Sequence, residues 1–271
     1  MNVADRYGPW AVVAGASEGV GRAIARELAR RGVPCVLLAR RTAPLDALMR
    51  EIHDETGVTC AAAAVDLAAP DALARIVGAV GTRQVGLFVA NAGADPYGSH
   101  FLDREAADWQ ALVQRNVMTT MSACHHFGAA MRARRKGGLL LVNSGACYGG
   151  ASFMATYAAS KAFMLNFSEA LWAELQPFGV DVLTLVLGQT DTPAFRRLLA
   201  DKGAPVPASL ASPDDVARVG LERLPHGPIH NWGLADDAAG YAPQSASARR
   251  ERVRTIDRMT QPLFGLKRDP R

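Results

Sequence analysis

Short, almost uninterrupted apolar segments alternate with longer helical segments along the first two thirds of the chain. Apolar segments of this kind are typical of strands buried on both faces, and such strands form parallel sheets covered by helices. Right-handed crossovers place helices on both faces, so the sequence predicts a doubly wound α/β fold with three layers, α/β/α. Strands are expected at residues 10–14, 34–39, 58–65, 85–90, 139–143 and 180–186, and helices at 20–31, 43–56, 71–80, 105–134 and 155–177.

The pattern is less regular beyond residue 188. Residues 213–224 read as a further helix, 225–240 as irregular, and 247–259 as a basic helix. With 271 residues and 49% hydrophobic content, the chain can bury one large core, so one domain spanning residues 1–271 is expected. Residues 188–271 are then the less regular part of that domain.

Charge is concentrated near the C-terminus. The whole chain carries a net charge of +4, which does not indicate a nucleic-acid partner. Residues 249–271 hold eight Lys and Arg against three Asp and Glu, a net charge of +5. This segment is interpreted either as a basic amphipathic helix that contacts an anionic membrane surface or acyl-carrier partner, or as a solvated helix packed on the domain.

Cysteine usage and hydropathy favour a protein of the cytoplasm. The four cysteines lie far apart without a Cys-x-x-Cys pair, which is typical of free thiols rather than of a disulfide framework or metal site. Nor does any apolar run reach the roughly 18 residues that a membrane span requires. We therefore expect no metal and no membrane-spanning segment.

A glycine-rich turn follows the first predicted strand and opens the first helix, with the sequence Gly15-Ala16-Ser17-Glu18-Gly19-Val20-Gly21. In this context glycines permit a tight turn and let the backbone and helix approach phosphate groups closely. The N-terminus of the helix supplies free N–H groups and a favourable dipole. The turn therefore predicts a binding site for the pyrophosphate of a dinucleotide.

Tyr157 and Lys161 share one face of a predicted helix, because residues four apart on a helix are neighbours. A phenol has a pKa of about 10, and a fixed cation beside it should lower that pKa. The pair can then donate or accept the proton that accompanies hydride transfer. Ser144 follows a predicted strand thirteen residues upstream of the tyrosine.

These motifs together resemble the short-chain dehydrogenase/reductase family, in its compact single-domain branch, over about residues 10–192. The resemblance implies a Rossmann-like fold in which Tyr157 is the general acid and base. It implies that Lys161 lowers the pKa of the tyrosine and binds the nicotinamide ribose, and that Ser144 holds the substrate oxygen. Asn116 would complete a proton relay to solvent, and the segment after residue 188 would form the substrate lid.

The resemblance also implies a set of cofactor-binding positions. They are Gly15, Ser17, Gly19, Val20, Gly21, Asp66, Leu67, Asn91, Ala92, Gly93, Tyr157, Lys161, Gly188, Thr190 and Thr192. An enzyme that prefers NAD carries an acidic residue at the end of the second strand, but Ala39 stands there, followed by Arg40 and Arg41. Because guanidinium groups suit the 2′-phosphate, the expected cofactor is NADP rather than NAD. Leu187 replaces a proline that is usual before Gly188 in the nicotinamide-binding turn.

Segments that flank the expected site are mainly apolar, which favours a hydrophobic ketone or secondary alcohol as the substrate. The residues are Tyr97, Phe101, Cys147, Tyr148, Phe153, Met154, Phe195, Leu198 and Leu199. The resemblance implies a homodimer formed through the two long helices. The predicted function is NADP-dependent interconversion of a carbonyl and an alcohol. The alternative is a dinucleotide-binding regulatory protein without turnover, which would be expected to lack one of the catalytic side chains.

Overall fold

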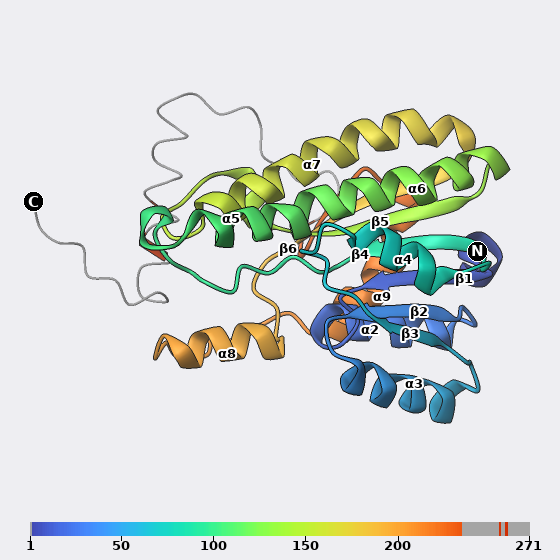
Figure 1. The fold of residues 1–271 in the computed structure, drawn as a ribbon, viewed down its shortest axis with the longest axis horizontal. Helices are drawn as coiled ribbons and strands as arrows, with labels where there is room; N and C mark the ends of the chain where they lie inside the picture. The colour runs from blue at the N-terminus through green and yellow to red at the C-terminus, as the bar shows by residue number, and fades with distance from the viewer. Residues whose placement is uncertain (1, 235–254, 256–257, 260–271) are drawn as a thin grey trace, which may run out of the picture.

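The computed structural model describes residues 2–234, 255 and 258–259, and within them seven strands form one parallel sheet (Figure 1). The strands are β1 (Trp10–Ala14), β2 (Cys35–Ala39), β3 (Ala61–Ala64), β4 (Val85–Ala90), β5 (Gly137–Ser144), β6 (Val180–Leu187) and β7 (Ile229–Asn231). The helices are α1 (Val3–Tyr7), α2 (Gly19–Arg30), α3 (Thr42–Thr56), α4 (Ala72–Val80), α5 (Ala106–Val113), α6 (Thr119–Arg134), α7 (Ala155–Leu175), α8 (Pro193–Asp201) and α9 (Pro213–Arg223). Single turns are η1 (Phe101–Asp103), η2 (Gln114–Met118), η3 (Gly145–Tyr148), η4 (Gln176–Phe178) and η5 (Leu224–His226).

The order of the strands is β3-β2-β1-β4-β5-β6-β7, so the chain reverses direction across the sheet between β1 and β4. Helices cover both faces, which confirms the predicted doubly wound, Rossmann-like fold. In such sheets ligands bind beyond the carboxyl ends of the strands, at the point where the order reverses. The segments that follow β1 and β4 are therefore neighbours at that edge.

Alternate residues of each strand enter two separate cores. In β1, Ala11 and Val13 pack with α2, α3 and α9, whereas Val12 and Ala14 pack with α4, α6 and α7. All four side chains are buried. Because successive residues of a strand point to opposite faces, a strand buried on both faces must be apolar throughout. This is the physical basis of the uninterrupted apolar segments in the sequence.

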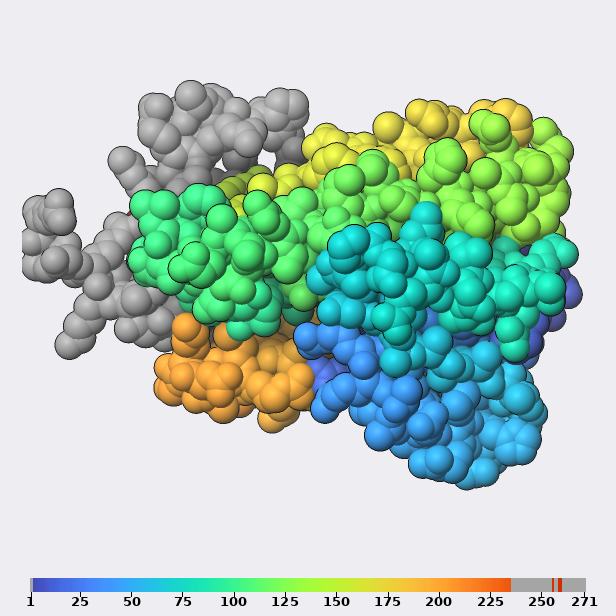
Figure 2. Space-filling view, in the orientation of Figure 1, coloured from blue at the N-terminus to red at the C-terminus, as the bar shows by residue number. Residues whose placement is uncertain are grey.

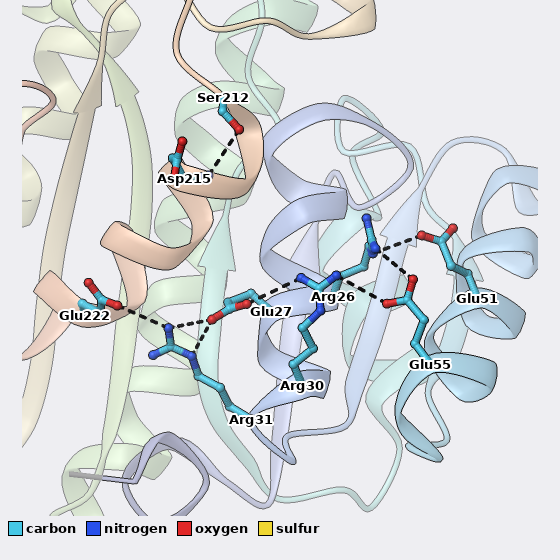
Figure 3. Close-up of polar contacts among 9 residues, drawn as sticks. All are labelled: Arg26, Glu27, Arg30, Arg31, Glu51, Glu55, Ser212, Asp215 and Glu222. Carbon is cyan, nitrogen blue, oxygen red and sulfur yellow. Dashed lines mark hydrogen bonds and ion pairs between the residues drawn. The ribbon is translucent and has the colours of Figure 1, made fainter.

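Ion pairs join the outer surfaces of α2 and α3 (Figure 3). Arg26 contacts Glu51 at 3.0 Å and Glu55 at 2.8 Å, and Arg31 contacts Glu27 at 2.6 Å. All of these side chains keep contact with water, so each pair is expected to contribute roughly 0–1 kcal/mol. The network fixes how α3 lies on α2 more than it stabilises the fold.

A second polar cluster ties the N-terminal helix to the amino edge of the sheet. The Tyr7 hydroxyl donates to Asp181 Oδ2 at 2.8 Å, and Arg6 forms an ion pair with the same carboxylate. The Tyr7 side chain is 1% exposed. It fits against β5 because Gly138 has no side chain there: a Cβ at that position would lie 2.8 Å from Tyr7 Cε1. These contacts attach α1 to the amino ends of β5 and β6.

Two of the predicted elements that differ in extent from those observed are a long helix and the third strand. The long helix predicted at residues 105–134 is interrupted by η2, a π-helical turn between α5 and α6. The strand predicted at 58–65 shortens to β3, whose register places Val36 opposite Ala61. Directly before β3, the Cys35 N–H donates to Cys60 Sγ at 3.4 Å, so β2 contacts this residue through its side chain.

The region after β6 contains structure that the sequence pattern did not indicate. Residues 225–240 were expected to be irregular, but β7 pairs with β6 in parallel, with Val186 opposite Asn231. The strand is only three residues long and half-buried, so it lacks the apolar pattern of the others. Helices α1 and α8 were likewise not predicted. The predicted basic helix at 247–259 lies almost wholly outside the described residues.

Within residues 2–234, no helix combines the length and apolar character needed to cross a membrane.

Candidate active site

The glycine-rich turn lies at the carboxyl end of β1 and leads into α2. Gly15 has φ +86°, and a Cβ there would lie 2.9 Å from Ala92; a Cβ at Gly21 would lie 2.1 Å from the Gly15 oxygen. Only glycine fits these two positions without a shift of the backbone. The Asn91 side chain donates to the Gly15 oxygen at 2.9 Å and so fixes the turn. Asn91, which the sequence predicts to contact the cofactor, thus uses its side chain to hydrogen-bond the glycine-rich turn.

The ends of β3 and β4 supply the other predicted dinucleotide positions. Asp66 is exposed just after β3, and its carboxylate accepts from the Ala68 N–H at 3.0 Å, which makes a local turn rather than a helix cap. Leu67 is buried, and its carbonyl accepts from the Thr119 hydroxyl at 2.8 Å. The side chain of Asp66 remains accessible at the edge where an adenosine would lie. Ser17 is half-buried in the glycine-rich turn, and Val20 is buried in the first turn of α2.

Arg40 and Arg41 follow β2, and both are exposed. A third guanidinium, that of Arg115 in η2, lies near Arg40: burial lowers the pKa of Arg115, and the charge of Arg40 lowers it further. Arg115 also donates to the Ala94 oxygen at 3.0 Å, which holds its head group at this edge. The sequence did not point to Arg115, because only the fold brings η2 beside the end of β2.

The predicted nicotinamide-binding turn joins β6 to α8. Thr190 is buried, and its hydroxyl donates to the Gly188 oxygen at 3.3 Å. The Thr192 hydroxyl accepts from the Phe195 N–H at 3.2 Å and so caps the N-terminus of α8. Both threonines therefore shape the turn. β6 continues to Leu187, the residue that stands in place of the usual proline.

Ser144, Tyr157 and Lys161 meet at the carboxyl end of β5. Ser144 is the last residue of that strand, and its hydroxyl hydrogen-bonds to Tyr157 in the first turn of α7. Lys161 Nζ lies 5.7 Å from the centre of the Tyr157 ring and donates to the Val142 oxygen at 3.1 Å. The structure thus brings together the three side chains that the sequence predicted to act jointly.

The pKa of Tyr157 shifts in the direction opposite to the one expected. Burial raises it, and the charges of Asp95 and Cys147 add to this effect, while only the hydrogen bond from Ser144 lowers it. Part of the tyrosine surface remains accessible, but protein atoms crowd the phenol closely. Burial also lowers the pKa of Lys161 to about 8. In the protein alone, desolvation is the largest influence on the pKa of each group.

Asn116 occupies the π-helical turn η2 and is 4% exposed. Its amide donates to Ser160 Oγ at 3.1 Å and to the Gly93 oxygen at 3.4 Å, and Ser160 in turn donates to the Tyr157 carbonyl oxygen at 2.7 Å. π-helical turns inside α-helices occur frequently at functional sites. Here the wider turn directs the predicted relay residue towards α7.

Asn143 is a buried residue of the site that the sequence did not single out. Its side-chain oxygen accepts from the Ser144 N–H at 2.9 Å, and its amide donates to the Lys161 carbonyl oxygen at 3.1 Å. It therefore joins the end of β5 to α7. No pattern marks it, apart from its place directly before Ser144.

Asp95 is a second residue that the sequence did not indicate. Its carboxylate accepts from the Tyr97 N–H at 2.8 Å, and burial raises its pKa. The negative charge of Asp95 also raises the pKa of Tyr157. Such an interaction between segments 62 residues apart cannot be read from either segment alone.

The predicted apolar residues do not all border the site in the same way. Cys147, Phe153 and Leu199 are buried, whereas Phe101 is 52% exposed. The Tyr148 hydroxyl donates to Asn231 Oδ1 at 2.6 Å, so η3, directly after Ser144, is tied to β7. The short last strand thus helps to place a wall of the site.

This fold and these side chains define a class of protein. Residues 9–203 match the family described as short chain dehydrogenase. The chain belongs to this family, whose members are oxidoreductases that use NAD or NADP and act on CH–OH and C=O groups. Gly15 and Gly21 let β1, α2 and the segment Asn91-Ala92 pack closely in a tight turn, the geometry that a dinucleotide-binding turn requires, so the residues fit this cofactor.

Individual relatives are similar over most of their length. A 7beta-hydroxysteroid dehydrogenase from Clostridium sardiniense is 32% identical over 224 residues, which cover 83% of this chain and 85% of that protein. A solved structure of a 7beta-hydroxysteroid dehydrogenase has a TM-score of 0.85 at 26% identity and covers 94% of this chain and 99% of that one. A short-chain dehydrogenase from Sphingobium yanoikuyae in complex with NADPH has a TM-score of 0.76 at 25% identity, with 97% and 98% covered.

Proposed function

We propose that the protein interconverts a ketone and a secondary alcohol on a hydrophobic, steroid-like substrate, with NADP as the cofactor and Tyr157 as the general acid and base. The observation that carries this proposal is the meeting of Ser144, Tyr157 and Lys161 at the carboxyl end of β5. None of the three side chains is replaced, which argues against the alternative of a regulatory protein without turnover.

In this proposal Tyr157 gives its phenolic proton to the substrate oxygen during reduction and takes it back during oxidation. Ser144 donates a hydrogen bond to the same oxygen, where negative charge develops. Bound NADPH would supply the hydride. The ammonium of Lys161 stabilises the phenolate left behind, and the contacts from Asn116 through Ser160 to the Tyr157 carbonyl hold α7 in place.

The preference for NADP rests on charge at the end of β2. Arg40 and Arg115 lie close enough for one guanidinium to lower the pKa of the other, which makes this edge attractive to a dianionic phosphate. No acidic residue stands at Ala39, where an NAD-binding site would place one. NADP-complexed relatives of similar fold support the same assignment.

A hydrophobic substrate is supported by the residues around the site and by the relatives. Phe195 and Leu198 of α8 are partly exposed, and α8 follows the nicotinamide-binding turn directly, where a lid would lie. Relatives of similar length are named 7beta-hydroxysteroid dehydrogenases. A fused-ring ketone would match both observations.

A homodimer and a cytoplasmic location complete the proposal. α6 and α7 lie side by side on one face of the molecule (Figure 1). Met118, the N-cap of α6, is 43% exposed, and Phe163 of α7 is 41% exposed. Large apolar side chains on two adjacent helices favour burial against a second copy. The four free thiols favour a reducing compartment.

The first test is a fluorescence titration of the purified protein with NADPH and with NADH, followed by NADPH consumption over a panel of steroid and aryl ketones. We expect NADPH to bind more tightly and Arg40→Ala to weaken NADPH more than NADH. Equal binding of the two cofactors would contradict the NADP assignment. Tight binding without turnover of any ketone would favour the regulatory alternative.

A further inference from the structure

An ion pair connects the glycine-rich turn to the helix after β6. Arg197 of α8 contacts the carboxylate of Glu18 through both terminal nitrogens, with Nη2–Oε1 at 2.5 Å and Nη1–Oε2 at 3.2 Å. The two residues are 179 positions apart in the sequence. Figure 2 shows the surface of α8, in orange, beside the blue surface of the N-terminal segments. The contact thus bridges the two segments that bound the dinucleotide site.

This pair contributes little to the stability of the fold. Arg197 is 59% exposed and Glu18 29% exposed in their side chains, and ion pairs in contact with water contribute roughly 0–1 kcal/mol. A bidentate contact across a binding site suggests a different role, one that depends on charge beside the ligand.

Glu18 has an unusual position for an acidic residue. It is the N-cap of α2, the helix whose N-terminus faces the pyrophosphate, but its side chain makes no capping hydrogen bond. A carboxylate at a helix N-terminus interacts favourably with the helix dipole. Beside a bound diphosphate, however, the same carboxylate repels the ligand unless a cation neutralises it.

We propose that Arg197 is a positioning residue that neutralises Glu18 beside the cofactor pyrophosphate and so couples the seating of α8 to dinucleotide binding. When Arg197 pairs with Glu18, the repulsion is removed and α8 is drawn towards the glycine-rich turn. The proposal relies on the proposed function only in that a nicotinamide dinucleotide occupies the glycine-rich turn.

Other contacts place α8 against the same turn. A Cβ at Gly19 would lie 2.9 Å from Thr192 Cγ2, so the N-terminus of α8 touches the glycine-rich turn directly. At the other end of the helix, Lys202 Nζ donates to the Gly98 oxygen at 3.3 Å. The base of the segment is closed where Asp191 N donates to the Ala211 oxygen at 3.0 Å. The segment from Asp191 to Ala211 is therefore a loop closed at its base whose helix is held over the site by a few polar contacts.

The test measures binding rather than turnover, by titrating the full-length protein with NADPH and following the fluorescence of the bound nucleotide. Arg197→Ala should raise the Kd about fivefold, the size expected for one uncompensated charge near a helix terminus. Glu18→Gln combined with Arg197→Ala should return the Kd to within about twofold of wild type, because the repelling charge is gone. The defect of Arg197→Ala should shrink at high salt, since the screening length falls from roughly 10 Å at 0.1 M to roughly 3 Å at 1 M.

Arg196→Ala is the matched control. Arg196 lies on the same helix and pairs with Asp191 at 2.7 Å, so it does not neutralise Glu18. It should leave the Kd and its salt dependence close to those of wild type. An unchanged Kd in Arg197→Ala, or a double variant that binds as weakly as Arg197→Ala, would overturn the proposal. Failure of the wild-type protein to bind any dinucleotide would instead contradict the proposed function.

Discussion

The two ends of β5 each hold a tyrosine in a polar cluster, and the two clusters are built differently. At the amino end, Tyr7 is 1% exposed and donates its hydroxyl hydrogen to the carboxylate of Asp181, which also pairs with Arg6. At the carboxyl end, Tyr157 keeps part of its surface accessible and bonds to the neutral hydroxyl of Ser144. Burial raises the pKa of both phenols.

The difference lies in where the proton can go. The proton of Tyr7 is donated to the partly buried carboxylate of Asp181, so moving it would cost that hydrogen bond. Tyr157 lies beside a hydroxyl and near Lys161, whose own pKa is lowered to about 8. Groups whose pKa values are displaced by desolvation in an accessible site are typical of acid–base chemistry. The comparison predicts that one tyrosine supports the fold and the other supports turnover.

The largest effect should follow from removing the hydroxyl of Tyr157. Tyr157→Phe should lower kcat about 10²- to 10⁴-fold, the range for a lost general acid, with little change in the free energy of unfolding. Initial rates of NADPH consumption and urea unfolding curves measure the two quantities. A variant with nearly full activity would exclude Tyr157 as the acid.

At the opposite end of the strand, Asp181→Ala should affect stability instead. It leaves Arg6 and Tyr7 without their shared partner, and since Arg6 is partly exposed we expect a loss of about 2–3 kcal/mol in the free energy of unfolding. Activity per folded molecule should be unchanged at temperatures below the transition. Urea denaturation of wild type, Asp181→Ala and the matched variant Asp181→Asn would measure this effect. A loss of turnover without a loss of stability would contradict the assignment of this cluster to the fold.

A pH profile tests the electrostatics of the catalytic cluster. Lys161 loses its proton as the pH rises through about 8 in the free protein, so kcat/KM for reduction should fall above this pH. The fold should not weaken over the same interval. Unfolded lysine keeps its proton up to about pH 10.5, so between pH 8 and 10 the unfolded state binds more protons than the folded state. Through this group, the free energy of unfolding therefore rises as the pH rises across that interval. Thermal unfolding at each pH separates the two effects, and a profile that is flat through pH 9 would contradict the role of Lys161.

The contrast between the two clusters also shows what the sequence could reveal. Ser144, Tyr157 and Lys161 were recognisable because a strand end and a helical repeat place them at a fixed spacing. Strands β1, β2 and β4 were predictable because burial on both faces makes each of them an uninterrupted apolar segment. The Tyr7 cluster, by contrast, joins α1 to β6 across 174 residues and leaves no local pattern.

The parts of the site that were missed are tertiary in origin. The raised pKa of Tyr157 was not foreseen, because the spacing between Tyr157 and Lys161 carries no information about burial. Nor does it show that Asp95, in a distant segment of the chain, lies near enough to raise this pKa. The π-helical turn of Asn116 and the strand β7 likewise depend on packing partners rather than on periodicity. Spacing predicted which side chains would meet, whereas packing sets their pKa values.

The smallest effect, and the most specific to the catalytic cluster, should come from Asp95. Asp95→Asn retains an oxygen that can accept the Tyr97 N–H but removes a negative charge that raises the pKa of Tyr157. The pKa of Tyr157 should therefore fall, and the rising limb of kcat/KM for alcohol oxidation, which requires the phenolate, should move to lower pH. Asp108→Asn is the matched control, because Asp108 pairs with Arg104 and acts on Tyr97 rather than on Tyr157. If both variants leave the limb where wild type has it, the carboxylate of Asp95 does not act on the phenol of Tyr157.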